Sequence, residues 1–226
     1  KLDARSLQVG GSWMPHKRGS KPKTNDPDIL KIFYNHIPKN KPTVLYDIGA
    51  STGSFSMLAK FNPKMRVYSF EPQPNIFEVL EQNIKINNLA RRVITFQIAL
   101  SDKETVLSLQ VPKKLSQSGL ATLGVPLRFT QAQSVNVASG ILAYFTKDFA
   151  LPDSTHISFA TEGAELLVLN GGEKIIHRTK PILLLEYSEK NTQQFGYHAE
   201  KIMALLSRWG FRIEHLGNED ILCLPR

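Results

Sequence analysis

The chain has 226 residues, 42% of them hydrophobic, and a formal net charge of +8, which favours one domain around one substantial core. Its single cysteine, Cys223, excludes an intramolecular disulfide and a cysteine-based zinc site. No apolar run approaches the roughly 20 residues that cross a bilayer, and the start lacks a signal-peptide core, so we expect a cytoplasmic protein without a transmembrane segment.

The first 40 residues are predicted to form a basic arm and a helix. Residues 1–28 combine glycines, prolines and basic side chains with little apolar periodicity, which is typical of an arm. Asp26 and Pro27 suit a helix start, and the apolar residues that follow predict a helix to about His36. We expect this helix to pack on the edge of a main domain, residues 41–226.

The stretch from Thr43 to Gly53 predicts a strand, a tight turn and the start of a helix that reaches about Phe61. Gly49 lets the backbone turn sharply. Gly53 lets a ligand approach the first helical turn, whose free N–H groups favour an electron-rich group. This stretch therefore predicts a small-molecule site.

Strands and helices then alternate, with a strand at 66–71, an amphipathic helix at 75–88 and a strand at 93–100. This alternation predicts an α/β fold with a mostly parallel, Rossmann-like sheet flanked by helices. The carboxyl ends of these strands would line one crevice.

Residues 101–150 are predicted to be an insertion that covers the crevice, with one strand near 105–111 and another within 127–137. The remaining predicted elements are a strand at 156–160, a helix opening at 162–165, a strand at 181–187, a helix at 192–209, and an antiparallel hairpin of strands 210–216 and 221–224.

Two features favour S-adenosylmethionine over a dinucleotide as the ligand of the glycine turn. Ser51 stands where a dinucleotide turn needs its second glycine, and Asp47 would repel a pyrophosphate but attract an ammonium and a sulfonium. Glu71 ends the second strand, where a carboxylate can accept both hydroxyls of an adenosine ribose. The alternative is that Asp47 caps a turn and Glu71 is a solvated strand end.

The segment from Gln97 to Asp102 is the expected neighbour of the adenine. Asp102 could accept a hydrogen bond from the exocyclic amine or could be a solvated turn acid. The predicted cofactor-binding residues are Asp47, Gly49, Ala50, Ser51, Gly53, Glu71, Pro72, Ala99, Leu100 and Asp102.

Several segments, in this order, resemble the FkbM-type S-adenosylmethionine-dependent methyltransferases. They are YDIGASTG at 46–53, VYSFEP at 67–72, residues 83–89, ALSD at 99–102, TEGAE at 161–165 and PILLLE at 181–186. The resemblance covers about residues 40–190. It implies a class I methyltransferase sheet with a C-terminal antiparallel hairpin, S-adenosylmethionine bound by residues 41–226, and a hydroxyl of a sugar or natural product as the usual acceptor.

One departure concerns the fourth strand. The family usually has Lys-x-Asp-x-Glu-Gly there, whereas this chain has SFATEG at 158–163, with Ala160 in place of the aspartate. Either the acceptor differs from the usual one, or the protein is a catalytically impaired homologue that binds S-adenosylmethionine.

Methyl transfer is an in-line displacement at an activated sulfonium, so the protein mainly aligns the acceptor and removes its proton. Glu162, at the head of a helix, and Glu186, at the end of the most apolar strand, are the catalytic candidates. Glu162 could equally compensate a helix dipole. His156 is expected to be structural, and no cluster has metal-ligand spacing, so no metal is predicted.

The predicted function is O-methylation of a small-molecule or sugar hydroxyl, with a small molecule or glycan as partner. The basic arm and the net charge keep an RNA or other nucleic-acid methyltransferase as the alternative, although the basic residues are spread out.

Overall fold

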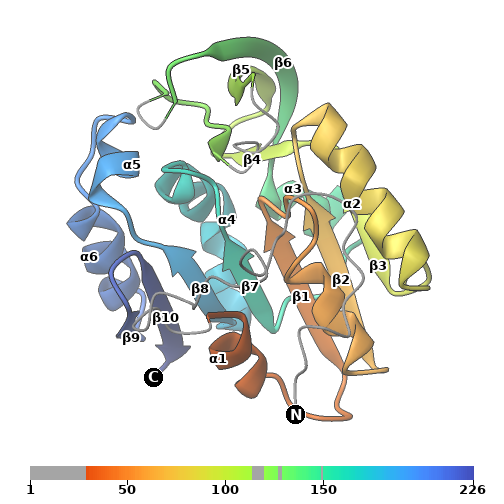
Figure 1. Cartoon of the computed structure of the whole chain (residues 1–226). Helices are drawn as coiled ribbons and strands as arrows, with labels where there is room; N and C mark the ends of the chain where they lie inside the picture. The colour runs from red at the N-terminus through yellow and green to blue at the C-terminus, as the bar shows by residue number, and fades with distance from the viewer. Residues whose placement is uncertain (1–28, 114–119, 127–128, 149) are drawn as a thin grey trace, which may run out of the picture.

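The computed structural model describes residues 29–113, 120–126, 129–148 and 150–226. The predicted arm, residues 1–28, lies outside the described residues. A seven-stranded sheet in the order β3-β2-β1-β7-β8-β10-β9 forms the centre of the described chain (Figure 1). Its strands are β1 (Thr43–Ile48), β2 (Met65–Phe70), β3 (Val93–Phe96), β7 (His156–Phe159), β8 (Ile182–Glu186), β9 (Phe211–Leu216) and β10 (Asp220–Pro225).

The strands from β3 to β8 run parallel, and β10 runs antiparallel to both β8 and β9. The predicted mostly parallel sheet with a C-terminal antiparallel hairpin is therefore confirmed. The chain builds the sheet outward from β1, first through β2 to β3 and later through β7 to β8. The carboxyl ends of β1 and β7 thus flank the point where the strand order reverses, which is where open α/β sheets bind ligands.

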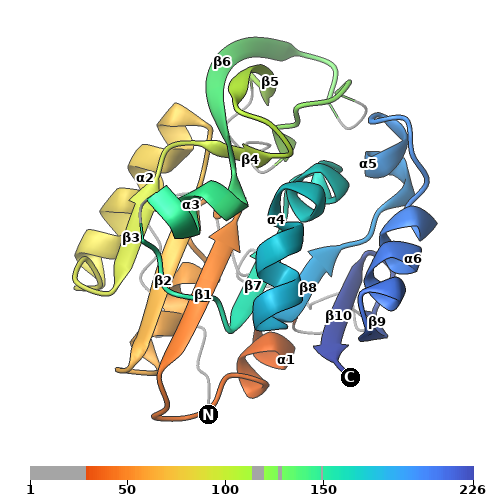
Figure 2. The same ribbon diagram turned by 180° about the vertical axis from the view of Figure 1, so that it is seen from behind.

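Helices cover both faces of this sheet (Figures 1 and 2). One face packs against α1 (Ile29–Asn35), the 3-10 helix η2 (Ser56–Lys60) and α2 (Pro74–Ile86). The other face packs against α3 (Leu142–Asp148), α4 (Glu165–Thr179) and α6 (Glu200–Arg208), while the short α5 (Glu189–Gln193) follows β8. The central strands are buried along most of their length, as expected for parallel strands covered on both faces. Strand β8 is apolar up to Glu186, whereas β1 and β7 also bury polar side chains, among them Asp47 and Ser158.

Two predicted helices are shorter in the structure. The helix expected from Thr52 to Phe61 is reduced to η2, because Gly53 has a φ of +96°, which an α-helix does not accommodate. The helix expected over 192–209 is divided into α5 and α6, with Gly196 at a φ of +75° between them.

The apolar run at 93–100, predicted as one strand, is divided between two sheets. Its first half is β3, and its second half is β4 (Ala99–Ser101), which belongs to a small sheet with the order β4-β6-β5. That sheet, with β5 (Thr105–Pro112) and β6 (Ala132–Ile141), stands over the carboxyl ends of β1 and β2 (Figure 1). Helix α3, which follows β6, was not predicted.

The first helix packs on one face of the central sheet. Phe33 of α1 is fully buried and meets the rings of Phe55 and His156 edge-on, each with centroids 5.7 Å apart. The His156 ring also lies 3.2 Å from the carbonyl oxygen of His36, and burial lowers its pKa to about 4. His156 therefore joins α1 to β7, at the amino end of that strand.

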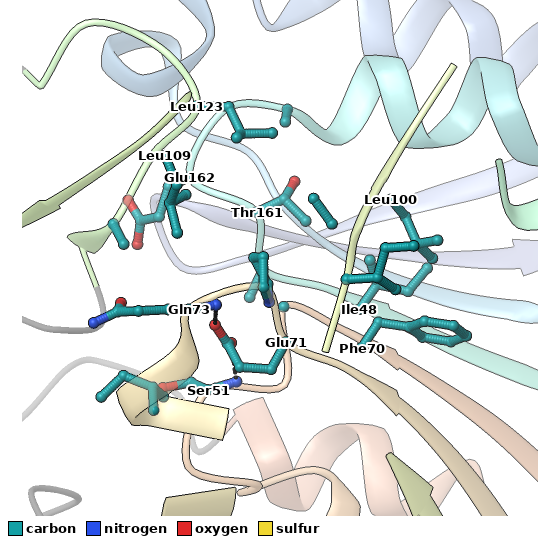
Figure 3. A pocket seen from close by; sticks show the side chains of 18 residues that line it. Ile48, Ser51, Phe70, Glu71, Gln73, Leu100, Leu109, Leu123, Thr161 and Glu162 are labelled. Carbon is teal, nitrogen blue, oxygen red and sulfur yellow. Dashed lines mark hydrogen bonds between the residues drawn. The ribbon is translucent and has the colours of Figure 1, made fainter. Parts of the chain in front are cut away.

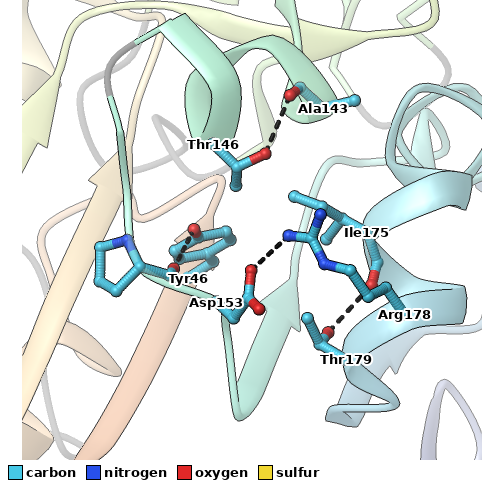
Figure 4. A network of polar contacts seen from close by, with 8 residues as sticks. Tyr46, Ala143, Thr146, Asp153, Ile175, Arg178 and Thr179 are labelled. Carbon is cyan, nitrogen blue, oxygen red and sulfur yellow. Dashed lines mark hydrogen bonds and ion pairs between the residues drawn. The ribbon is translucent and has the colours of Figure 1, made fainter.

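A polar network secures the segment that leads into β7 (Figure 4). The buried Tyr46 hydroxyl donates to the carbonyl oxygen of Pro152 over 2.6 Å, and Asp153 pairs with Arg178 of α4. Burial is the main cause that raises the pKa of Tyr46 above its ordinary value. The network thereby connects β1, the segment before β7 and α4.

Among the described residues, no helix is long and apolar enough to cross a membrane.

The burial of Phe33 predicts that α1 is an integral part of the domain. Phe33→Ala should lower the free energy of unfolding by about 3–5 kcal/mol, because it leaves a cavity between α1 and the sheet. Urea denaturation would measure this change. Ile86→Ala, at a side chain that is 51% exposed, should change it by less than about 1 kcal/mol. Equal effects of the two substitutions would contradict the integral role of α1.

Candidate cofactor and acceptor site

A pocket of about 620 Å³, part of it open to solvent, lies between the carboxyl ends of the central strands and the small sheet (Figure 3). Its floor is formed by the ends of β1, β2 and β7, and its cover includes Leu109, Ala121 and Leu123. The prediction that residues 101–150 cover the crevice is confirmed by these three side chains.

The glycine turn after β1 is fixed by its close approach to β7. Gly49 has a φ of +75°, and a Cβ there would lie 2.0 Å from the carbonyl oxygen of Ala160. The backbone amides of Gly49 and Ala50 donate to the carbonyl oxygen of Phe70 over 2.9 and 3.0 Å. The turn therefore joins the ends of β1, β2 and β7, and only glycine fits at position 49.

Glu71 follows β2 and places its carboxylate at the pocket wall. The side chain is 6% exposed, and its two oxygens accept hydrogen bonds from the backbone amides of Ser51 and Gln73, each over 2.8 Å (Figure 3). Burial raises the pKa of Glu71 to about 7, against the opposing effect of these two amides. Because each carboxylate oxygen has a second lone pair, Glu71 can still accept two hydroxyl hydrogens.

Much of the remaining pocket wall is apolar. Ile76 of α2 and the segment from Ile98 to Leu100 are part of it. Leu109 and Leu123 line the cover above Glu71. An oriented carboxylate beside an apolar slot matches the two parts of an adenosine, a ribose diol and a flat base. The residues present therefore fit S-adenosylmethionine.

Asp47 lies beneath the glycine turn and does not line the pocket. It is 2% exposed and accepts hydrogen bonds from the hydroxyls of Ser56, over 2.5 Å, and Ser158, over 3.0 Å. Ser56 is also 2.7 Å from the hydroxyl of Ser69. Burial raises the pKa of Asp47, despite these hydrogen bonds. The network connects β1, β2, β7 and η2 directly under the site.

After the end of β7, Glu162 lines the pocket and has a φ of +53°. Its carboxylate accepts a hydrogen bond from Asn191 over 3.0 Å, and the same side-chain amide donates to Glu186 over 2.7 Å. Glu186 itself does not line the pocket. Asn191 thus links the two predicted catalytic carboxylates, and no local sequence pattern had pointed to this residue.

Glu165 holds the loop that carries Glu162. It is 1% exposed, and one carboxylate oxygen accepts hydrogen bonds from the amide and hydroxyl of Thr161 and from the amide of Gly163, at 2.8–3.4 Å. Burial raises its pKa. Glu165 is therefore a buried side chain that supports this loop.

The structure brings together some of the predicted site residues and not others. Those that line the pocket are Gly49, Ser51, Glu71, Pro72, Ala99, Leu100 and Glu162. Those that do not are Asp47, Ala50, Gly53, Asp102 and Glu186. Asp102 is exposed and accepts a hydrogen bond from the Ser101 hydroxyl over 3.2 Å. Within the described ranges, no group of three or more His, Cys, Asp or Glu side chains could hold a metal ion.

The strand order, the terminal hairpin and a pocket at the switch point define a class I methyltransferase fold. The chain belongs to the FkbM methyltransferase family, because the model of the methyltransferase FkbM domain matches residues 47–213. No curated protein matches the sequence.

Solved structures share this fold at low sequence identity. A methyltransferase FkbM from Methylobacillus flagellatus KT is 15% identical with a TM-score of 0.56, over 88% of this chain and 48% of that one. The present chain thus spans about half of that protein. A precorrin-6y C5,15-methyltransferase from Geobacter metallireducens GS-15 is 13% identical with a TM-score of 0.53, over 87% of each chain. A precorrin 8w decarboxylase from Methanobacterium thermoautotrophicum is 14% identical with a TM-score of 0.51, over 89% and 91% of the two chains.

The raised pKa of Glu71 predicts a pH-dependent stability. Its ordinary value of 4.5 applies to the unfolded chain and about 7 to the folded one, so the folded state binds the proton more tightly. The free energy of unfolding should therefore fall as the pH rises from about 4.5 to 7, by at most about 3 kcal/mol from this group. Urea denaturation across this range should show a smaller fall for Glu71→Gln. If the free energy of unfolding depended on pH identically in the variant and the wild type, the raised pKa of Glu71 would be contradicted.

Proposed function

We propose that this protein transfers a methyl group from S-adenosylmethionine to a hydroxyl oxygen of a small molecule or sugar. The observation that carries the proposal is the Glu71 carboxylate, held by two backbone amides at the rim of an apolar pocket. A carboxylate in this position suits a ribose diol, and the FkbM family to which the chain belongs transfers methyl groups.

In this proposal, residues of the glycine turn and of the pocket wall would hold the cofactor. Glu71 would accept hydrogen bonds from the ribose hydroxyls, Ile98 and Leu100 would contact the base, and Gly49 and Ser51 would contact the methionine part. Asp47 acts from below, because its carboxylate orders the serines that support the turn. When bound, S-adenosylmethionine supplies a methyl group on a positively charged sulfur, which is open to in-line displacement.

The acceptor would enter beside the end of β7. Glu162 is the carboxylate of this side that lines the pocket, so we assign to it the removal of the hydroxyl proton. Glu186 would act indirectly, because the Asn191 side-chain amide donates a hydrogen bond to both carboxylates. Ala160 lines the pocket without any polar side-chain group, which leaves proton removal to Glu162.

Calorimetry tests the cofactor assignment. The protein should bind both S-adenosylmethionine and S-adenosylhomocysteine, and Glu71→Ala should weaken binding by about 1–3 kcal/mol because charged hydrogen bonds are lost. Glu78→Ala, at an exposed glutamate of α2, is the matched control and should leave the affinity unchanged. No heat from either ligand would reject the cofactor, while unchanged affinity in Glu71→Ala would reject the ribose role alone.

Turnover tests the acceptor assignment. Product formation over a panel of phenols, sugars and other hydroxyl compounds should identify an acceptor, and Glu162→Gln should then lower kcat by at least about 100-fold, because the proton acceptor is lost. Affinity for S-adenosylhomocysteine, whose sulfur is uncharged, should be unchanged in this variant. Cofactor binding without turnover over the whole panel would favour a protein that binds S-adenosylmethionine without transferring its methyl group.

A further inference from the structure

The side-chain amide of Asn191 occupies the space between two carboxylates from neighbouring strands. Glu162 follows β7 and Glu186 ends β8, and these strands pair in parallel, so the two side chains project at the same edge of the sheet. The Nδ2 atom of Asn191 is 3.0 Å from Oε2 of Glu162 and 2.7 Å from Oε1 of Glu186. Both hydrogens of the amide are thereby used, one for each carboxylate.

The backbone of residue 191 also determines where Glu162 lies. A Cβ at Gly163 would come within 2.3 Å of the carbonyl oxygen of Asn191, so the loop after β7 packs directly on α5. The carbonyl oxygen of Glu162 accepts two further hydrogen bonds, from the Thr122 hydroxyl over 3.1 Å and from the Gln194 amide over 3.0 Å. The left-handed conformation of Glu162 is therefore held from the cover and from the α5 side together.

The orientation of the Asn191 amide follows from these contacts. Asn191 is 1% exposed, and its Oδ1 atom has no hydrogen-bond partner among the described residues. Rotating the amide by half a turn would place Oδ1 against two carboxylates, so the observed orientation is the favourable one. A buried acceptor without a partner is unfavourable for stability. Its presence at the acceptor side of the pocket indicates that the fold retains the amide for the two donors that it offers.

We propose that Asn191 is a positioning residue that fixes the Glu162 carboxylate toward the group transferred from the cofactor. This inference rests on the proposed function, in which Glu162 receives the acceptor proton. Asn191 acts through Glu162 and does not line the pocket itself. Its two donors allow two carboxylates to lie close together, with one of them at the pocket wall.

Binding of two cofactor analogues tests the inference without knowledge of the acceptor. S-adenosylhomocysteine lacks the transferred methyl group, whereas sinefungin carries an amine in its place. A carboxylate that faces the methyl position should make sinefungin bind at least about tenfold more tightly than S-adenosylhomocysteine. The dissociation constant of S-adenosylhomocysteine divided by that of sinefungin, both measured by calorimetry, therefore reports where the Glu162 carboxylate lies.

Asn191→Leu, which removes both donors at similar volume, should lower this ratio about tenfold while the S-adenosylhomocysteine affinity changes less than about twofold. Glu162→Gln should lower it similarly, and the double variant should show no further loss. Asn191→Ser retains one donor and should keep part of the preference. Lys190→Ala, at the exposed neighbour on α5, is the matched control and should keep the wild-type ratio.

The role of Asn191 would be overturned, with the proposed function left intact, if the wild-type protein bound the two analogues equally well. It would also be overturned if the ratio were unchanged in both Asn191→Leu and Asn191→Ser, or if these variants lost the same affinity for both analogues. Fully additive losses in the double variant would also overturn it, because Asn191 would then act independently of Glu162. A wild-type protein that binds neither analogue would overturn the proposed function, and this inference with it.

Discussion

The site depends on the contact between the turn after β1 and the end of β7. At Gly49 the backbone comes so close to the Ala160 carbonyl that no side chain can be accommodated. Backbone amides of the same turn donate hydrogen bonds to the carbonyl oxygen at the end of β2. Beneath the turn, Asp47 accepts hydrogen bonds from the hydroxyls of Ser56 in η2 and Ser158 in β7. Three strand ends are therefore held in one rigid floor. Glu71 and Glu162 follow two of these strand ends, those of β2 and β7.

Two kinds of hydrogen-bond donor hold the carboxylates that line the pocket. On the side proposed for the cofactor, backbone amides hold Glu71. On the side proposed for the acceptor, side chains do this, with Glu165 under the loop and Asn191 between the two carboxylates. Backbone donors persist through most substitutions. Side-chain donors are lost or replaced by a single substitution. The contacts around Glu162 can therefore vary while the backbone contacts of Glu71 are retained.

The sequence predicted those parts of the fold whose signals are local. The apolar run before Gly49, the acid that ends β2 and the terminal hairpin all carry their pattern within a few residues, and each has its expected place. The apolar run at 93–100 was misread because it has the same pattern whether it serves one sheet or two. Asn191 could not be found, since its role exists only where β7, β8 and α5 meet. The cover residue Leu123 lies in a stretch without clear periodicity. The alternation around Leu109 predicts a strand, but it does not indicate that the apolar face of this strand covers the pocket.

The hydrogen bond from Thr122 to the Glu162 carbonyl has a consequence for how such a protein diverges. It connects the cover, which is built by the insertion between β4 and β6, to the loop that carries the proposed proton acceptor. An insertion or deletion near residue 122 would therefore alter the shape of the entrance and the conformation of Glu162 at once. Selectivity for the acceptor and the rate of its reaction would then evolve as one inherited trait.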